Sequence, residues 1–103
     1  MSDLIDGKRI GKRISAVRQA ATLSQGELAR RLGWPRDTLI NYEHGRRTLS
    51  VERLAALAGA LHVHPAVLLT EDDRLAALIQ RLSADAGLAS QVAFFIDTLD
   101  TSD

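Results

Sequence analysis

The chain has 103 residues, which suits one domain with a short appendage, and its 13 basic side chains balance 13 acidic ones. Cysteine is absent, which excludes both a disulfide framework and a thiolate metal site. No apolar run reaches the length of a membrane span and residues 1–20 are too charged for a signal peptide, so we expect a cytoplasmic protein.

Apolar spacing predicts seven short helices and therefore an all-α fold. The first covers about residues 8–21. Ser24 and Glu27 have the spacing of a capping box, which predicts a second helix over residues 25–32. Gly33 ends this helix, since the tight turn that follows needs a residue that tolerates positive φ.

The third and fourth helices have clear start signals. Pro35 begins the third helix, where its missing N–H costs nothing, and Gly45 stops it. Ser50 caps the fourth helix. The residues that we expect to face inward from this fourth helix are Val51, Leu54, Ala55, Ala58 and Leu61.

Three more helices are predicted after it. His64 and Pro65 begin a short fifth helix, and the acidic residues 71–73 favour the N-terminus of a sixth through the helix dipole. Gly87 breaks the sixth helix and a seventh follows. Their apolar stripes are Leu75, Leu78, Ile79 and Leu82, then Leu88, Val92, Phe95, Ile96 and Leu99.

Charge is unevenly distributed despite the zero net balance. Residues 8–47 hold ten Lys and Arg against three acidic residues, whereas residues 48–103 hold three against eight. A basic half suggests a polyanionic partner and an acidic half points away from it, although a solvated face gives the same pattern.

Ala29, Gly33 and Leu39 have the spacing of a helix-turn-helix: a small residue where two helices cross, a glycine in the turn and an aliphatic anchor. With the run Tyr-Glu-His-Gly-Arg-Arg at residues 42–47, they make the chain similar to the XRE family of Cro and phage-repressor type helix-turn-helix regulators over about residues 8–69. The resemblance implies five helices packed as one unit, with the third in the major groove of DNA.

The sequence departs from that family at three places. The family usually has a hydroxyl residue where Pro35 stands, a proline near Leu49 or Ser50, and a glycine near His62. The first departure alters how the recognition helix is capped, and the second alters how the following loop is stiffened. Because histidine is among the few non-glycine residues enriched at positive φ, we expect a left-handed conformation at His62.

The resemblance also implies which residues contact DNA. Arg36, Asp37 and Asn41 match base-reading positions: arginine suits guanine and asparagine suits adenine, while Asp37 either accepts from cytosine or holds Arg36 in place. The positions that match phosphate contacts are Gln25, Thr38, His44, Arg46 and Arg47. For each of these side chains a solvated surface position is the alternative.

Arg18 and Glu43 match a pair that forms an internal salt bridge in the family, so the resemblance implies that they fix the recognition helix on the body of the domain. His62 and His64 lie two apart with no positioned carboxylate, and we interpret them as helix-end residues rather than metal ligands. With no nucleophile–base pair and no Gly-rich phosphate loop in view, we expect neither a cofactor nor enzymatic activity.

The sequence therefore predicts a DNA-binding domain over residues 1–70 and a helical dimerisation segment over residues 71–103. The segment either folds back onto the first and fifth helices or packs against a second subunit. We favour the second subunit, because a two-fold dimer places two recognition helices about 34 Å apart, facing successive major grooves.

The favoured hypothesis is a sequence-specific transcriptional regulator, with repression as its mode, that binds double-stranded DNA as a homodimer on a two-fold operator. A protein-interaction adaptor with the same fold and an antitoxin that represses its own operon are the alternatives. The basic half and the polar tips of Arg36 and Asn41 favour DNA, since an adaptor should present a more apolar face.

Overall fold

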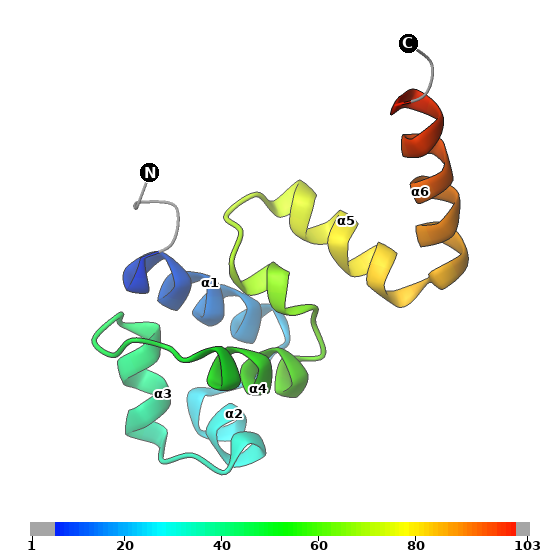
Figure 1. The fold of residues 1–103 in the computed structure, drawn as a ribbon. Coiled ribbons are helices and arrows are strands. Elements are labelled where there is room, and N and C mark those ends of the chain that lie inside the picture. Colours follow the sequence, from blue (N-terminus) through cyan, green and yellow to red (C-terminus); the bar gives the residue numbers. More distant parts are fainter. Residues whose placement is uncertain (1–5, 101–103) are drawn as a thin grey trace.

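The computed structural model describes residues 6–100, and these form six α-helices and one 3₁₀ helix without any strand. The elements are α1 (Gly7–Ala20), α2 (Gln25–Leu32), α3 (Arg36–Glu43), α4 (Val51–Leu61), η2 (Pro65–Leu68), α5 (Asp73–Ala84) and α6 (Ala86–Asp100). The predicted all-α fold is confirmed. Residues 7–68, from α1 to the end of η2, pack into one body, and α5 and α6 form an arm that projects from it (Figure 1).

Side-chain caps explain where most helices begin. The hydroxyl of Ser24 accepts from the backbone N–H of Glu27 at 3.1 Å while the Glu27 carboxylate accepts from the N–H of Ser24 at 2.8 Å, so the predicted capping box is confirmed. The start of α3 differs by one residue from the prediction. Pro35 is the N-cap (φ −60°, ψ 143°) and the helix begins at Arg36, without a side-chain cap.

Two helices end in the left-handed conformation, as predicted. Gly33, with φ 70°, ends α2, and His62, with φ 58°, ends α4. At His62 the backbone N–H reaches the carbonyl of Gly59 at 3.2 Å, and the next N–H, of Val63, reaches the carbonyl of Ala58 at 3.0 Å. Histidine therefore ends α4 in a conformation in which glycine would be the commonest residue.

The core of the body takes one large aliphatic side chain from each of its five helices. These fully buried residues are Ile14, Leu28, Leu39, Leu57 and Leu68. The prediction for α4 was wrong at two positions: Val51 and Ala55 are exposed, and Leu57 is buried with Ala58 and Leu61. The buried stripe of α4 is therefore rotated about the helix axis, away from Val51 and Ala55. The apolar pattern of an alanine-rich helix does not determine this rotation.

The joint between body and arm is largely polar. Arg13 of α1 donates from Nε to the carbonyl of Val67 at 2.9 Å and from Nη1 to Asp73 of α5 at 2.8 Å. Gln80 of α5 accepts from the backbone N–H of His64 at 3.0 Å and donates to the carbonyl of His62 at 3.2 Å. Ala76 is the buried residue of α5. These contacts hold α5 against η2 and α1.

The arm bends at Asp85, and the prediction that Gly87 breaks the helix was wrong. Asp85 is extended (φ −136°, ψ 98°) and its carboxylate accepts from the N–H of Leu88 at 3.0 Å, so it ends α5 and caps α6. Gly87 lies in the first turn of α6. A short side chain that bonds to the backbone competes with helix continuation, and here it decides the boundary.

The apolar side chains of the arm are mostly exposed. In α6 the exposed fractions are 68% for Phe94, 61% for Phe95, 49% for Ile96 and 54% for Leu99, and in α5 Leu75 and Leu78 are also exposed. The start of the arm contacts the body, with α5 against η2, whereas α6 meets α5 at the bend and points away (Figure 1). In residues 6–100 no helix is both long and apolar enough to cross a membrane.

Candidate nucleic-acid interface

The turn between α2 and α3 fixes how the two helices cross. Ala29 is 2% exposed at the crossing, and its carbonyl accepts from the N–H of Trp34, just beyond the left-handed Gly33, at 3.0 Å. The fully buried Leu39 anchors α3 from the other side. The spacing of small residue, glycine and aliphatic residue therefore produces the helix-turn-helix geometry.

The two faces of α3 differ in burial. Its inner face, formed by Leu39, Tyr42 and Glu43, is buried. Arg36 and Asp37 are exposed at the N-terminal end of the helix, and Asn41 follows one turn later, half-buried. The three residues that match base-reading positions are therefore at least partly accessible, on a helix whose buried residues are held by the core.

A buried ion pair holds α3 on α1. Arg18 Nε donates to Glu43 Oε2 at 2.7 Å and Arg18 Nη2 donates to Oε1 at 3.1 Å, which is a bidentate arrangement. The third guanidinium nitrogen, Nη1, donates to the carbonyl of Leu23 at 2.9 Å. Both charged residues are less than 10% exposed, so the pair tethers α3 to α1 in a largely desolvated position.

Gln25, which matches a phosphate-contacting position, joins the same network. Its Nε2 donates to Glu43 Oε1 at 3.0 Å, so the start of α2 is tied to the end of α3. An amide nitrogen carries two hydrogens. One of them is used on Glu43, and the second is the one that a phosphate oxygen could accept.

Arg46 and Asn41, which match a phosphate-contacting and a base-reading position, contact each other. Arg46 Nη1 donates to Asn41 Oδ1 at 3.3 Å, and the backbone N–H of Arg46 donates to the carbonyl of Asn41 at 2.9 Å. An amide oxygen has two lone pairs, so Asn41 can still accept from a base. Arg46 thus lies where it can orient the carboxamide of Asn41 as well as meet a phosphate.

The remaining phosphate candidates surround α3. Thr38 is half-buried in its first turn, and its backbone N–H donates to the carbonyl of Pro35 at 3.0 Å. His44 is exposed and is the C-cap of the helix. Arg47 lies beyond it with its guanidinium carbon 5.4 Å from the centre of the Tyr42 ring.

An aromatic and cationic cluster behind α3 was not predicted from the sequence. The rings of Trp34 and Tyr42 have centroids 5.7 Å apart. Arg53 of α4 lies 4.7 Å from the Trp34 centroid and donates from Nη1 to the Tyr42 hydroxyl at 3.2 Å. Arg53 precedes the buried Leu57 by one turn, and a cation on the core-facing stripe of a helix is the signal that could have identified it.

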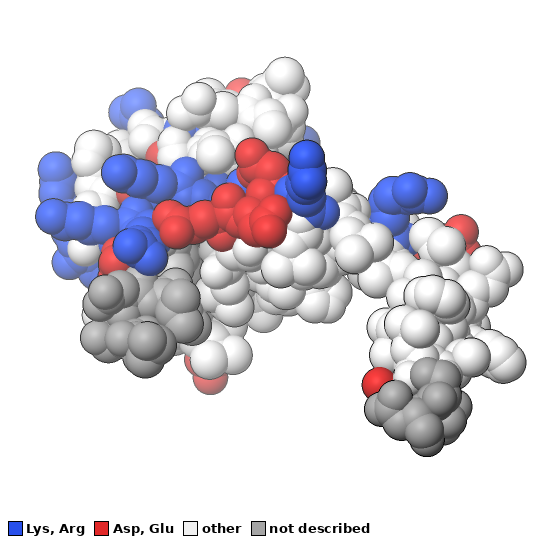
Figure 2. Space-filling model, turned by 90° about the horizontal axis from the view of Figure 1, so that it is seen from above, with Lys and Arg blue, Asp and Glu red and all other residues white. Residues whose placement is uncertain are grey.

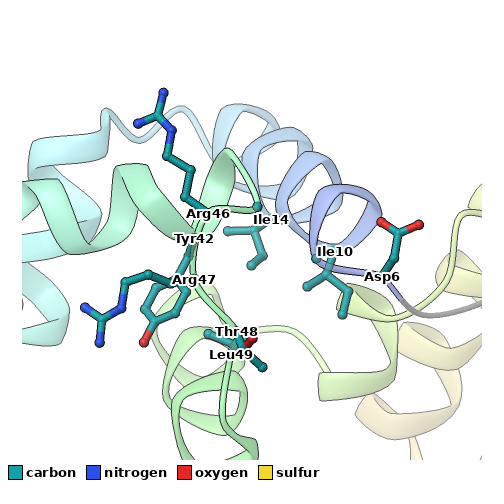
Figure 3. Close-up of a pocket in the computed structure, with 10 residues that line it drawn as sticks. Asp6, Ile10, Ile14, Tyr42, Arg46, Arg47, Thr48 and Leu49 are labelled. Atoms are coloured by element: carbon teal, nitrogen blue, oxygen red, sulfur yellow. The ribbon is translucent and has the colours of Figure 1, made fainter.

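A hollow of about 310 Å³ lies between the start of α1 and the loop after α3 (Figure 3). Its apolar lining comes from Ile10, Ile14, Tyr42 and Leu49. The side chains of Arg46 and Arg47 extend away from this hollow in Figure 3, so their guanidinium groups are presented outward.

Charge follows the division into body and arm. Seen from above, most Lys and Arg gather over the body with a few on the inner part of the arm, Asp and Glu form a band beside them, and the outer part of the arm is mainly uncharged (Figure 2). The cationic surface therefore belongs mainly to the part that carries the helix-turn-helix.

In the part of the chain that the structure describes, no three His, Cys, Asp or Glu residues cluster as metal ligands would.

Comparison with known proteins agrees with this geometry. Residues 14–68 match the family described as Helix-turn-helix. A solved structure of the restriction-modification controller protein C.AhdI from Aeromonas hydrophila is 34% identical over 66% of this chain and 98% of its own, with a TM-score of 0.59. The transcriptional regulator BswR is 28% identical over 85% of this chain and 92% of its own, with a TM-score of 0.72. No curated protein matches the chain.

Proposed function

The chain belongs to the helix-turn-helix family, of XRE type, and from this premise we propose that it is a transcriptional repressor that binds a two-fold operator as a homodimer. It binds double-stranded DNA through α3 and works in the cytoplasm, where that DNA is found. The observation that carries the proposal is the set of accessible polar residues of α3, Arg36, Asp37 and Asn41, on a helix whose buried residues fix it to the core.

Base recognition follows from the chemistry of that side. The guanidinium of Arg36 can donate two hydrogen bonds to O6 and N7 of guanine, and the carboxamide of Asn41 can pair with N6 and N7 of adenine. Asp37 either accepts from the amino group of cytosine or orients Arg36. Because Glu43 and Leu39 fix α3 from within, the backbone that carries these side chains needs little ordering when DNA binds.

Phosphate contacts surround the recognition helix in this proposal. The groups assigned to them are the side chains of Gln25, Thr38, His44, Arg46 and Arg47. They lie at the start of α2, in the first turn of α3 and just after its C-terminal end. Contacts of this kind set the register of the protein on the duplex and supply the salt-dependent part of the affinity.

The exposed apolar side chains of the arm are the reason for proposing a homodimer. The exposed apolar residues of α6 need a surface that excludes water, and a second copy of the same arm supplies one by two-fold symmetry. Two recognition helices about 34 Å apart could then meet successive major grooves. A protein-interaction adaptor is disfavoured because the accessible side of α3 is polar.

Selection of bound duplexes from a random pool, followed by titrations at stated salt concentrations, tests the proposal. Arg36→Ala should cost about 1–3 kcal/mol on the selected site and relax preference at one base pair. Arg74→Ala, on the arm, is the matched control and should leave base preference unchanged. Equal losses on selected and random DNA for Arg36→Ala would refute its role in reading bases.

A further inference from the structure

The four cationic side chains of the first two turns of α1 divide between two environments. Arg9 and Arg13 face the arm, where Arg9 pairs with Glu71 at 3.6 Å and Arg13 pairs with Asp73 at 2.8 Å. Lys8 and Lys12 are exposed, and within residues 6–100 neither forms an ion pair with a carboxylate. Carboxylates at the start of the arm therefore pair with Arg9 and Arg13, and in the part of the chain that the structure describes they leave Lys8 and Lys12 without such a partner.

These lysines lie beside the C-terminal end of the recognition helix because α1 crosses it at backbone contact. A Cβ added at Gly11 would lie 2.3 Å from the carbonyl oxygen of Glu43, and one added at Gly45 would lie 2.9 Å from the Cα of Lys8. A side chain at Gly11 would therefore push α1 away from the end of α3, and one at Gly45 would push it away from the loop that follows α3. Lys8 and Lys12 flank Gly11 and are thus held at a fixed distance from α3.

An open hollow of about 600 Å³ connects these lysines to two of the phosphate-contacting candidates. Lys8, Lys12, Ser15 and Gln19 line it from α1, and Gln25 and His44 line it from α2 and the end of α3. Its acidic residue, Glu43, is already engaged by Arg18 and Gln25. The accessible groups that remain in the hollow are cations and hydrogen-bond donors. Such a surface is suited to binding an anion.

We propose that Lys8 and Lys12 bind backbone phosphates of the operator, so that the face of α1 extends the DNA contact beyond the helix-turn-helix. This inference rests on the proposed function. A lysine ammonium contributes a point charge to a phosphate and carries no base information by itself. The competing role for the lysines, stabilising the negative end of the α3 dipole, would affect folding stability and not the number of phosphates contacted.

The test is a salt titration of duplex binding with the full chain carrying Lys8→Gln and Lys12→Gln together. The slope of log K against log salt should become shallower by roughly 1.8 for each subunit, and so by roughly 3.6 for the bound dimer, because each phosphate contact contributes about 0.9. The base preference obtained by selection should not change. Lys8→Arg with Lys12→Arg keeps both charges and should retain the original slope.

Arg74→Gln with Arg81→Gln removes the same charge from α5 and is the matched control, with an unchanged slope expected. A slope for the lysine variant equal to that of this control overturns the inference and leaves the proposed function standing. Loss of thermal stability with an unchanged slope overturns it as well, in favour of the dipole role. Failure of the unmodified chain to bind any duplex overturns both proposals.

Discussion

In the body, every helix contributes a large aliphatic side chain that is fully buried, whereas in the arm Ala76 is the buried residue and the large apolar side chains of α6 are exposed. The helices of the arm, with 12 and 15 residues, are not shorter than most helices of the body and also carry apolar side chains. The two regions differ in whether other helices of the same chain cover the apolar faces. Five short helices close a core, but two helices in a bent arm cannot enclose each other.

This difference separates two kinds of information in an apolar stripe. The stripe reports that a face is to be buried, but not what buries it. In the body each helix is covered by other helices of the body, some of them distant in sequence, as α1 is by α3 and α2 is by α4. In the arm, α5 packs against η2, whereas α6 projects away from the body. We propose that a second copy of the chain covers the exposed apolar face of α6.

The largest expected effect comes from breaking the apolar face of α6. Phe95→Asp places a charge in the proposed dimer contact, so the chain should sediment as a folded monomer at micromolar concentration. Its affinity for a two-fold site should fall by about 10²–10⁴-fold, the loss expected when two linked binding events become independent. Ser90→Asp, on the opposite side of α6, is the control. An unmodified chain that is monomeric at this concentration and binds tightly would remove the contrast between body and arm.

The next largest effect concerns the stability of the body. Glu43→Gln leaves the buried Arg18 without its charged partner, and loss of one partner of such a pair costs about 3–5 kcal/mol of the free energy of unfolding. Denaturant titration measures this loss. Glu52→Gln, an exposed position in the first turn of α4, should change the same free energy by less than about 0.5 kcal/mol. Similar small values for both variants would mean that the ion pair does not hold the body together.

Features that depend on a few neighbouring residues could be predicted from the sequence. The capping box at Ser24, the left-handed Gly33 and the left-handed His62 each follow from local backbone chemistry and are present. The packing of α3 on α2 also followed, because the spacing from Ala29 to Leu39 determines which residues meet. These features position the candidate DNA-reading face.

Features that depend on tertiary context could not be predicted. The rotation of α4 that buries Leu57 and exposes Val51 is set by the helices it packs against. The bend at Asp85 required knowing that its carboxylate would reach the N–H of Leu88. The uncompensated charge of Lys8 and Lys12 depends on which face of α1 the arm occupies, and a charge count along the chain does not contain that information.

A smaller effect is expected at the joint between the two regions. Gln80→Ala removes two hydrogen bonds to the backbone after α4, each contributing about 0.5–1.5 kcal/mol, so α5 should open more readily. Amide hydrogen exchange should then show lower protection in α5 and unchanged protection in α2 and α3. Ser83→Ala is the control, because the Ser83 hydroxyl bonds to a carbonyl within α5 itself. A uniform loss over the whole chain would mean that body and arm unfold as one unit.

The smallest expected effect concerns a local cap, in a region whose stability comes mainly from its core. Hydrogen bonds from the backbone and then the side chain of Ser24 hold the pKa of Glu27 below its ordinary value of 4.5. A carboxylate whose pKa is lower in the folded state stabilises the fold above pH 4.5, and its contribution disappears as the pH falls through the folded value. The melting temperature of the unmodified chain should therefore exceed that of Glu27→Gln at pH 7, and the difference should shrink at acidic pH. Ser24→Ala keeps the backbone donor and should leave part of the pKa shift in an NMR titration. A Glu27 that titrates at or above its ordinary value would show that the cap adds nothing to the packing of α2 against the core.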